Sequence, residues 1–282
     1  MIAFFGAGLM GAGFVQALRS RGEDVRVWNR TPERARALEV TGAVAVADAA
    51  ECARGADRLH FSLSADAAVD ALLARLEGAI DAGAIIVDHS TVSPAGTARR
   101  AATLAAKGVA FLSAPVFMNP TQAREGKGLM LVAGPAALHE RARPFLEQMT
   151  GAVWYVGDRV ERAAAYKLMG NATIVASVSG LADALAIARA NGLTPAEGVE
   201  LFAHFNPASQ LAVRGPKMAR QDWTPTFELA MARKDVGLML DAVGDAAPLA
   251  LLPAIAERMD ALLERGHGKH DLAVLAVDSV KP

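Results

Sequence analysis

The stretch that decides the fold is Ile2-Ala3-Phe4-Phe5-Gly6-Ala7-Gly8-Leu9-Met10-Gly11, at the start of the chain. Its first four residues are apolar and predict a buried strand, and residues 12–19 predict an amphipathic helix. Between them, Gly6 permits a tight turn, Gly8 leaves bare backbone to a pyrophosphate, and Gly11 lets the helix pack on the strand. Phosphate groups bind at the free N–H groups of such a helix start. The sequence therefore predicts a dinucleotide site at this turn, made by Gly6, Ala7, Gly8, Leu9, Met10 and Gly11.

The end of the second predicted strand, Val27-Trp28-Asn29-Arg30-Thr31, bears on which nucleotide binds. An NAD-selective site places Asp or Glu about twenty residues past the glycines, where it binds the ribose 2′-hydroxyl. Here Asn29, Arg30 and Thr31 instead offer one cation and two small hydrogen-bonding side chains to a 2′-phosphate. The sequence predicts NADP as the cofactor, with NAD as the alternative if Arg30 is only a solvated loop residue.

Composition argues against several classes of protein. The 282 residues carry a formal net charge of -1 with scattered basic residues, which argues against nucleic acid or an anionic membrane as a partner. Cys52 is the single cysteine, so no internal disulfide framework forms, and no Cys/His spacing predicts a metal site. The chain enters its first strand without a leader-like segment, which predicts a cytoplasmic protein that binds a small-molecule substrate.

Apolar runs alternate with alanine-rich helical segments through about residue 158. The runs span residues 43–46, 58–62, 85–88, 109–114, 130–133 and 152–156. Such near-continuous apolar strands indicate a sheet that is covered on both faces. Repeated βα units of this kind predict an α/β fold with a Rossmann-like, doubly wound, mainly parallel sheet, whose ligand lies beyond the strand C-termini. We predict a dinucleotide-binding domain over residues 1–160.

From residue 161 the pattern is helical only, and it predicts an all-α substrate and dimerisation domain over residues 161–282. Its first helix is expected to end at Asn191-Gly192, and the next to begin with a capping box formed by Thr194 and Glu197. The uncharged residues 168–182 are too few to span a bilayer and predict a buried helix. Because the helix is more apolar than a helical hairpin would cover, we expect a homodimer or homotetramer that buries Ile174, Val175, Val178, Leu181 and Leu185.

Lys167 and Asn171 stand out on this first helix. They lie one turn apart and share a face, with the small residues Ala163 and Ala164 one turn earlier on the same side. A helical lysine is usually solvated, but an unpaired ammonium on an otherwise uncharged helix at a domain junction is costly without a functional partner. Lys167 is therefore a candidate catalytic residue.

Five segments match a known pattern in order along the chain: Gly6–Gly11, Asp88-His89-Ser90-Thr91-Val92-Ser93-Pro94, Ala114-Pro115-Val116, Lys167-Leu168-Met169-Gly170-Asn171, and Phe227 with Lys234-Asp235. In these segments the chain resembles the β-hydroxyacid dehydrogenase family, which includes 3-hydroxyisobutyrate dehydrogenase and glyoxylate or tartronate semialdehyde reductases. The resemblance covers essentially the whole chain. It implies a helical domain like the C-terminal part of 6-phosphogluconate dehydrogenase, and an NAD(P)-dependent dehydrogenase or reductase.

The resemblance also implies roles for individual residues. Hydride would pass between NADP and a small β-hydroxyacid or its semialdehyde, with Lys167 as general acid and base. Ser90 and Asn171 would hold the substrate, Thr91 the nicotinamide, and Lys234 would close over the cofactor, which Ser62, Leu63 and Ser64 would line. The residues leave other interpretations open, in which Ser90 and Thr91 cap a helix that begins near Pro94 and Lys234 forms a surface ion pair.

Two departures from the family pattern affect the substrate site. The family usually has Ser-Gly-Gly after Ala-Pro-Val, where this chain has Phe117-Met118-Asn119, and Lys-x-x-Asn-Asn becomes Lys-x-x-Gly-Asn at Gly170. Bulky apolar groups replace bare backbone, Asn119 offers an amide to the substrate instead, and one hydrogen-bonding side chain is lost. The substrate therefore stays open. Two further interpretations are an imine reductase-like NADPH enzyme, although that group usually has Asp or Tyr where Lys167 stands, and a non-catalytic NADP-binding module.

Overall fold

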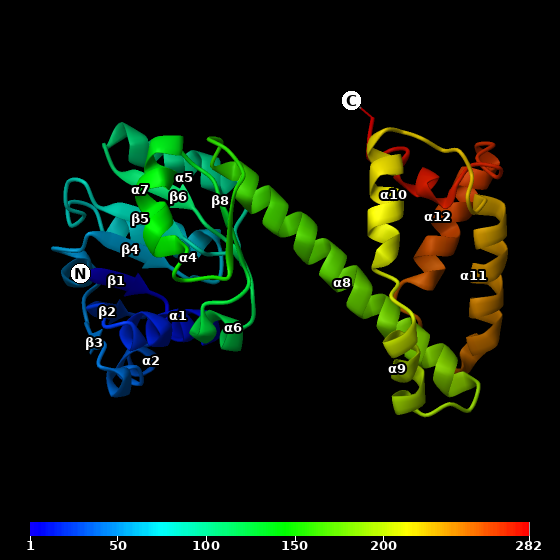
Figure 1. Cartoon of the computed structure of the whole chain (residues 1–282), viewed down its shortest axis with the longest axis horizontal. Coiled ribbons are helices and arrows are strands. Elements are labelled where there is room, and N and C mark those ends of the chain that lie inside the picture. Colours follow the sequence, from blue (N-terminus) through cyan, green and yellow to red (C-terminus); the bar gives the residue numbers. More distant parts are fainter. Residues whose placement is uncertain (282) are drawn as a thin grey trace. The chain divides into compact units, whose positions relative to one another are not determined.

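The computed structural model describes residues 1–281, which form two compact units (Figure 1). The first unit is Met1–Asn171 and the second starts at Ala172. The boundary falls inside the long helix α8 (Glu161–Ala190), so the first three turns of that helix belong to the first unit. The division predicted at residue 160 coincides with the start of α8 and stays a prediction.

A six-stranded parallel sheet forms the centre of the first unit, in the order β3-β2-β1-β4-β5-β6. The chain moves outward from β1 in one direction through β2 and β3, and then in the other through β4 to β6. The doubly wound parallel fold is thus confirmed, and its switch point lies between β1 and β4, where ligands bind in such sheets. The strands are β1 (Ile2–Phe5), β2 (Val25–Trp28), β3 (Val44–Ala45), β4 (Arg58–Phe61), β5 (Ile85–Asp88) and β6 (Ala110–Ser113).

Both faces of this sheet are covered, as the continuous apolar runs predict. Ile2 and Phe4 of β1 pack into one buried cluster with Phe14 of α1, whereas Phe5 points to the other face and packs with Phe61. All four β1 side chains are fully buried. The central strand therefore holds the turn that follows it rigidly in place.

The helices of the first unit connect the strands and begin where the sequence places caps. The side chain of Ser93 accepts a hydrogen bond from the Gly96 N–H and starts α5 at Pro94, so Ser90 and Thr91 are not its caps. The helices are α1 (Leu9–Ser20), α2 (Pro32–Arg36), α3 (Ala49–Ala53), α4 (Asp66–Arg75), α5 (Pro94–Ala106), α6 (Pro120–Glu125) and α7 (Ala136–Leu146), with a 3₁₀ turn at Glu39–Thr41.

The last two predicted strands do not extend the parallel sheet, contrary to the single alternating pattern. They form β8 (Leu129–Val132) and β9 (Ala152–Tyr155) of a separate three-stranded sheet, together with the antiparallel β7 (Val116–Phe117), which the sequence analysis missed. The N–H of Ala114 still bonds to Asp88, but Pro115 has no N–H with which to continue the ladder. The chain turns away there and carries Phe117 to a new position.

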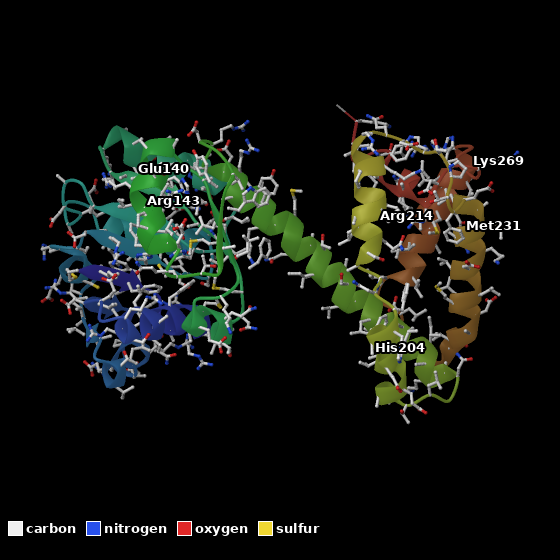
Figure 2. All side chains as sticks on the ribbon, in the orientation of Figure 1. Glu140, Arg143, His204, Arg214, Met231 and Lys269 are labelled. Carbon is white, nitrogen blue, oxygen red and sulfur yellow. The ribbon has the colours of Figure 1, made fainter. Side chains whose placement is uncertain are left out.

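The second unit is helical, apart from an isolated bridge, over its described residues. Asp183 of α8 accepts hydrogen bonds from the N–H groups of Ala250, Leu251 and Leu252 and so caps α12. Arg214 of α10, which is labelled in Figure 2, lies 3.4 Å from the buried Asp271. Thr194 and Glu197 cap α9 by the predicted capping box. The elements of the second unit after α8 are α9 (Pro195–His204), α10 (Ser209–Ala219), α11 (Leu229–Val243), α12 (Leu252–Glu264) and 3₁₀ turns at Gly244–Ala246 and Leu272–Ala276.

Helix α8 differs from its prediction in one respect. The buried helix predicted for residues 168–182 is largely exposed in the single chain, including Ile174, Val175 and Val178. By length and composition alone the full helix would also pass as a membrane span, a test that core helices of other proteins pass too. The apolar pattern identified a face that this chain alone does not cover.

Candidate active site

Four loops meet where parallel strands of the first unit end. Strands β1, β2, β4 and β5 pair in register, so Phe5 lies opposite Trp28 and Phe61, and Phe61 opposite Asp88. The residues that follow them are 6–8, 29–31, 62–64 and 89–91. Nearly all of the predicted site residues of this unit are thus brought to one edge of the sheet.

The three glycines of the first turn have distinct geometric roles. Gly6 has a φ of +104°, and a Cβ atom there would collide with the carbonyl of Ser62. A Cβ at Gly11 would collide with the carbonyl of Gly6, because α1 packs tightly on β1. At Gly8, by contrast, an added Cβ would meet no atom within 4 Å. Open space at Gly8, at the N-terminus of α1, fits a phosphate that approaches bare backbone.

Asn29 ties the first two loops together. Its Oδ1 accepts a hydrogen bond of 2.9 Å from the Ala7 N–H, and its Nδ2 donates one of 2.8 Å to the Thr31 carbonyl. The amide predicted to face a ligand therefore uses these hydrogen bonds to hold the glycine turn against the end of β2. Arg30 is exposed beside it.

A pocket of about 460 Å³ opens beside these loops. Three arginines line it, of which the sequence analysis predicted only Arg30. Arg34 lies on the short helix α2 that follows Arg30, four residues further along the sequence, whereas Arg75 comes from the far end of α4 and lies over the Trp28 ring at 5.8 Å. The wall is completed by Gly6, Gly8, Trp28, Asn29, Thr31, residues 62–65, Ala67, Ala68, Ala71 and Leu72.

A smaller pocket of about 190 Å³ shares Ser62 and Leu63 with the larger one. The two pockets are therefore neighbours along the sheet edge. Five of the smaller pocket's residues are polar or titratable: Ser62, His89, Ser90, Thr91 and Lys167. The others are apolar: Met10, Phe14, Leu63, Val116 and Met118.

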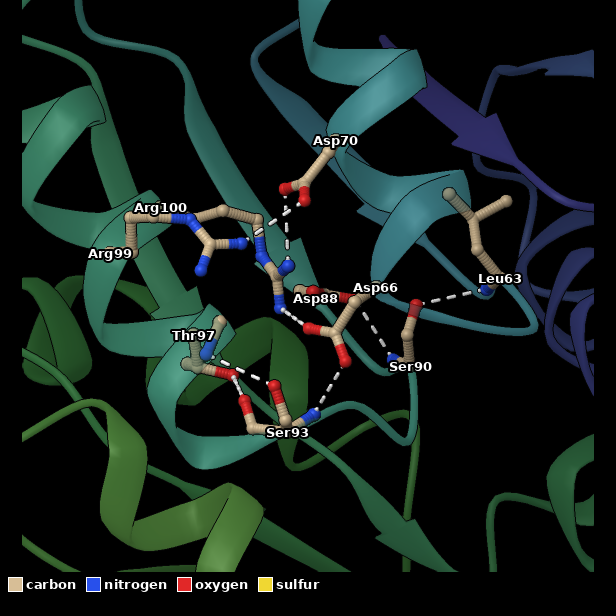
Figure 3. A network of polar contacts seen from close by, with 10 residues as sticks. Leu63, Asp66, Asp70, Asp88, Ser90, Ser93, Thr97, Arg99 and Arg100 are labelled. Atoms are coloured by element: carbon tan, nitrogen blue, oxygen red, sulfur yellow. Dashed lines mark hydrogen bonds and ion pairs between the residues drawn. The ribbon is translucent and has the colours of Figure 1, made fainter.

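Figure 3 shows how the loops after β4 and β5 are fastened to each other. The Ser90 hydroxyl accepts a hydrogen bond from the Leu63 N–H, and the Ser90 N–H donates to Asp88. Arg100, which is almost fully buried, lies 2.8 Å from Asp66 and 3.1 Å from Asp70 of α4. This network fixes Ser90 at the smaller pocket.

Asp88 within this network is buried and its carboxyl group is hard to ionise. Burial raises its pKa to about 6, although hydrogen bonds from Ser90 oppose the rise. Asp66 shows the opposite behaviour, because burial would raise its pKa but hydrogen bonds from Ser93 and the ion pair with Arg100 lower it overall. The contributions of the two carboxyl groups to stability therefore change in opposite directions with pH.

A buried histidine pair lies against the smaller pocket, and the sequence analysis did not predict it. His89 Nδ1 lies 2.8 Å from the Ala114 carbonyl, so it carries the proton, and His89 Nε2 accepts a hydrogen bond from His60 Nδ1 at 2.9 Å. Burial lowers the pKa of His89 to about 4 and that of His60 well below its ordinary value. Both imidazoles are therefore neutral at pH 7, and the sequence signal for the pair was His60 in an otherwise apolar strand.

Lys167 lies on the first turns of α8 and reaches the smaller pocket. Its side chain is half-buried, and burial lowers the pKa of its ammonium group. The Nζ atom lies 4.2 Å from the centre of the Phe117 ring. Among the described residues 1–281, Lys167 supplies the one charged side chain that lines this pocket. A half-buried cation with a lowered pKa at the wall of a pocket is suited to donating a proton.

The remaining predicted residues lie away from these pockets or make other contacts. The Asn119 side chain caps α6 by a capping box with Gln122 and lines neither pocket. Asn171 is half-buried, one turn after Lys167. Lys234 lies on α11 of the second unit, where it is exposed and 3.0 Å from Asp235. The roles of Asn171 and Lys234 stay predictions, and the structure gives Asn119 a different role, that of a helix cap.

Two families match consecutive parts of the chain. Residues 1–157 match the NAD binding domain of 6-phosphogluconate dehydrogenase. Residues 162–277 match the family described as NAD-binding of NADP-dependent 3-hydroxyisobutyrate dehydrogenase. Together they cover nearly the whole chain.

Similar proteins extend this result. Glyoxylate/succinic semialdehyde reductase 2, chloroplastic, of Arabidopsis thaliana is 32% identical over 88% of this chain and 71% of its own length. The 3-hydroxyisobutyrate dehydrogenase of Pseudomonas aeruginosa is 31% identical over 96% of this chain and 94% of its own. Among solved structures, an imine reductase from Myxococcus stipitatus in complex with NADP⁺ matches with a TM-score of 0.89 at 22% identity, covering 98% of each chain. A reductive aminase from Aspergillus terreus with NADPH and ethyl levulinate gives 0.90, also at 22% identity, over 99% of each chain.

Proposed function

Because this chain belongs to the β-hydroxyacid dehydrogenase family, we propose that it transfers a hydride between NADP and a hydroxyl-bearing carbon, with Lys167 as general acid and base. Membership makes it an NAD(P)-dependent dehydrogenase or reductase. The observation that carries the role of Lys167 is its position as the charged group of the smaller pocket, with a pKa lowered by burial. Small hydroxyacids and their semialdehydes, which the relatives' names include, are the substrate class that membership favours.

The fit of the nucleotide rests on the two neighbouring pockets. The open backbone at Gly8 and the start of α1 suit the pyrophosphate, and the arginine-lined pocket suits the adenosine end. Arg30, Arg34 and Arg75 line that pocket, and no Asp or Glu of residues 1–281 does. A 2′-phosphate would find cations there without a competing carboxylate, which supports NADP over NAD. The nicotinamide would then reach the smaller pocket past Ser62 and Leu63.

In the reaction, the bound nicotinamide supplies or accepts the hydride. When a carbonyl is reduced, the Lys167 ammonium gives a proton to the oxygen as negative charge develops on it. In the reverse direction the neutral amine takes that proton from the hydroxyl. Ser90 and Thr91 line the pocket beside Lys167, and Ser90 is held in place by Leu63 and Asp88, so it is positioned to orient the substrate.

The experiment that tests the role of Lys167 is its replacement by alanine. We expect K167A to lose turnover by about 100- to 10,000-fold, as removal of a general acid does, and to bind NADPH with unchanged affinity. The measurement is NADPH oxidation with glyoxylate and succinic semialdehyde, alongside NADPH titration. K127A is the matched control, because Lys127 is exposed and pairs with Glu125. Undiminished turnover of K167A would remove Lys167 from the chemistry.

Imine reduction is the second candidate, favoured by the Phe117 ring that packs against Lys167 and by the apolar Val116 and Met118 that line the smaller pocket. A cyclic imine in the same assay distinguishes the two activities. Faster NADPH oxidation with the imine than with any aldehyde would favour this candidate. NADPH binding without turnover on aldehydes and imines would favour a non-catalytic module.

We also propose a homodimer that covers α8. Ile174, Val178 and Leu181 follow one another at spacings of four and three residues, so they form a stripe, and all three are exposed in the single chain. Exposed apolar stripes of this kind mark association surfaces. Sedimentation of the wild type and of V178E would test this, with a monomeric wild type as the contradicting result.

A further inference from the structure

Two departures from the family pattern meet each other in space. Phe117 lies on β7 and Gly170 on α8, yet a Cβ atom added at Gly170 would collide with Cζ of the Phe117 ring and lie 2.6 Å from its Cε1. Real Cβ atoms do not approach ring carbons so closely. Phe117 therefore occupies the space that any side chain at position 170 would need, and glycine is the residue that fits beneath it.

The same ring covers the proposed proton donor. Lys167 and Gly170 are three residues apart and so share one face of α8. The ring centre lies 4.2 Å from Lys167 Nζ, within range of a cation–π interaction. One aromatic side chain thus lies over both the ammonium group and the glycine.

Packing holds this ring in place. Phe117 packs against the buried cluster of Leu131, Ala133, Val156 and Ala163, which joins the three-stranded sheet to α8. Leu129 lies opposite Phe117 in the β7–β8 register. Because the cluster is buried and its neighbours belong to regular elements, the ring is a fixed wall rather than a side chain that swings aside for a ligand.

This wall bears on the charge of the substrate. Phe117 lies between Val116 and Met118, which line the smaller pocket, and its ring meets that pocket at Lys167. Of the ten lining residues five are apolar, Ser62, His89, Ser90 and Thr91 are polar, and Lys167 is the one charged residue among those described. A carboxylate placed beside Lys167 would find no hydroxyl or amide group at positions 117 and 170 and would have the proton-donating ammonium as its one charged partner. A neutral group would instead pack against the apolar residues beside Lys167, Val116 and Met118, without needing such partners.

We infer that Phe117 and Gly170 act together as one specificity element, and that the substrate presents a neutral, apolar group to it rather than a carboxylate. This inference rests on the proposed function, because it concerns the substrate of the same site. It names the substrate class as neutral aldehydes or ketones, or esters of small aldehyde acids, with an apolar substituent beside the reacting carbon.

A matched pair of probes measures this preference. Succinic semialdehyde and its methyl ester share a carbon skeleton and differ in the carboxylate charge. We expect kcat/KM with NADPH to favour the ester by about tenfold or more in the wild type. In F117S/G170N, which restores hydroxyl and amide groups, the ratio is expected to fall by about tenfold. Preference of the wild type for the free acid, or an unchanged ratio in the double variant, overturns the inference.

Thermal unfolding tests the pair without any activity. G170A is expected to lower the melting temperature of the wild type, because the new methyl group collides with Phe117, but to raise it in the F117S background, where alanine only improves helix propensity. G180A is the matched control on the same helix, since a Cβ there would meet its nearest atom at 3.9 Å. If G170A stabilises the wild type as G180A does, the two residues are not coupled.

The two proposals can fail separately. Absence of NADPH oxidation with every probe defeats the proposed function, and the inference is then judged by binding of the two probes to the K167A–NADPH complex. Tighter binding of the ester supports the neutral wall, and tighter binding of the free acid overturns it. Turnover with preference for the free acid retains the proposed function and removes only the inference.

Discussion

The glycine turn at residues 6–11 and the wall formed by Phe117 and Gly170 lie in the same unit but differ in how well the sequence predicts them. In the turn, neighbours along the chain decide what each glycine provides, which is a positive φ at Gly6, open space at Gly8 and close packing at Gly11. The wall instead joins two residues from different elements that look like unrelated departures until the fold brings them together. Local backbone geometry can be predicted from the chain, whereas long-range packing cannot.

Within the turn, G11A and G8A separate folding from binding, and they give the largest expected effect. G11A forces a methyl group into the Gly6 carbonyl, so we expect a loss of about 3 kcal/mol or more in the free energy of unfolding. G8A has open space and is expected to change stability by less than about 1 kcal/mol, but to weaken NADPH binding. Denaturant unfolding and NADPH titration measure both. Equal stability of the two variants would show that Gly11 is not packed as described.

The network that joins the loops after β4 and β5 is tested by pH. Because the pKa of Asp88 is raised to about 6 in the folded protein, the native state binds more protons than the unfolded state between about pH 4 and 6, and stability falls as pH rises through that window. D88N keeps the acceptor for Ser90 and removes the charge, so we expect it to be about 1 to 3 kcal/mol more stable than the wild type at pH 7.

D66N is the control, because its expected effect on stability is opposite to that of D88N. The pKa of Asp66 is lowered, so its stabilisation is present above its unfolded pKa and lost as pH falls, and D66N should be less stable at pH 7. Thermal unfolding from pH 4 to 8 measures both variants. Destabilisation of D88N at pH 7 would contradict the buried, hard-to-ionise carboxyl group described for Asp88.

The R30A variant tests whether the arginine-lined pocket binds the 2′-phosphate of the cofactor. Loss of charge-assisted hydrogen bonds to a 2′-phosphate should weaken NADPH binding of R30A by about 10- to 100-fold and leave NADH binding nearly unchanged. R36A serves as the control, because Arg36 pairs with Glu33 on the same short helix and lines neither pocket. Equal losses for NADPH and NADH would show that Arg30 does not bind the phosphate.

The smallest expected effect is at the wall. F117L keeps apolar bulk beside Lys167 but removes the ring face that stabilises the ammonium group, so the pKa of Lys167 should fall further. The alkaline limb of kcat/KM for carbonyl reduction should therefore move to lower pH, whereas F117Y, which keeps the ring, should leave it in place. A limb that moves to higher pH in F117L would contradict the ring contact.

Most of the first unit followed from the sequence, and the misses have physical causes. Apolar runs and the glycine turn predicted the parallel sheet and its ligand edge, because strand burial and turn geometry are local properties. The separate sheet was missed because its β7 has two residues and depends on Pro115 ending a ladder. Arg75 and the pair His60–His89 could not be assigned to the site, since the fold brings them there from distant elements. The sequence predicted both a buried helix at residues 168–182 and a partner subunit over part of it, because an apolar helix has the same sequence pattern whether its own chain or a partner covers it.

In the proposed reaction, one ammonium group protonates the substrate oxygen beside a reduced nicotinamide. A crystal structure of the protein with NADPH and a slow substrate analogue would test this. We expect the nicotinamide ring in the smaller pocket, beside Ser62 and Leu63, with Lys167 Nζ at hydrogen-bond distance, about 3 Å, from the analogue's oxygen. A ring bound elsewhere, or a Lys167 amine turned to bulk solvent, would contradict it.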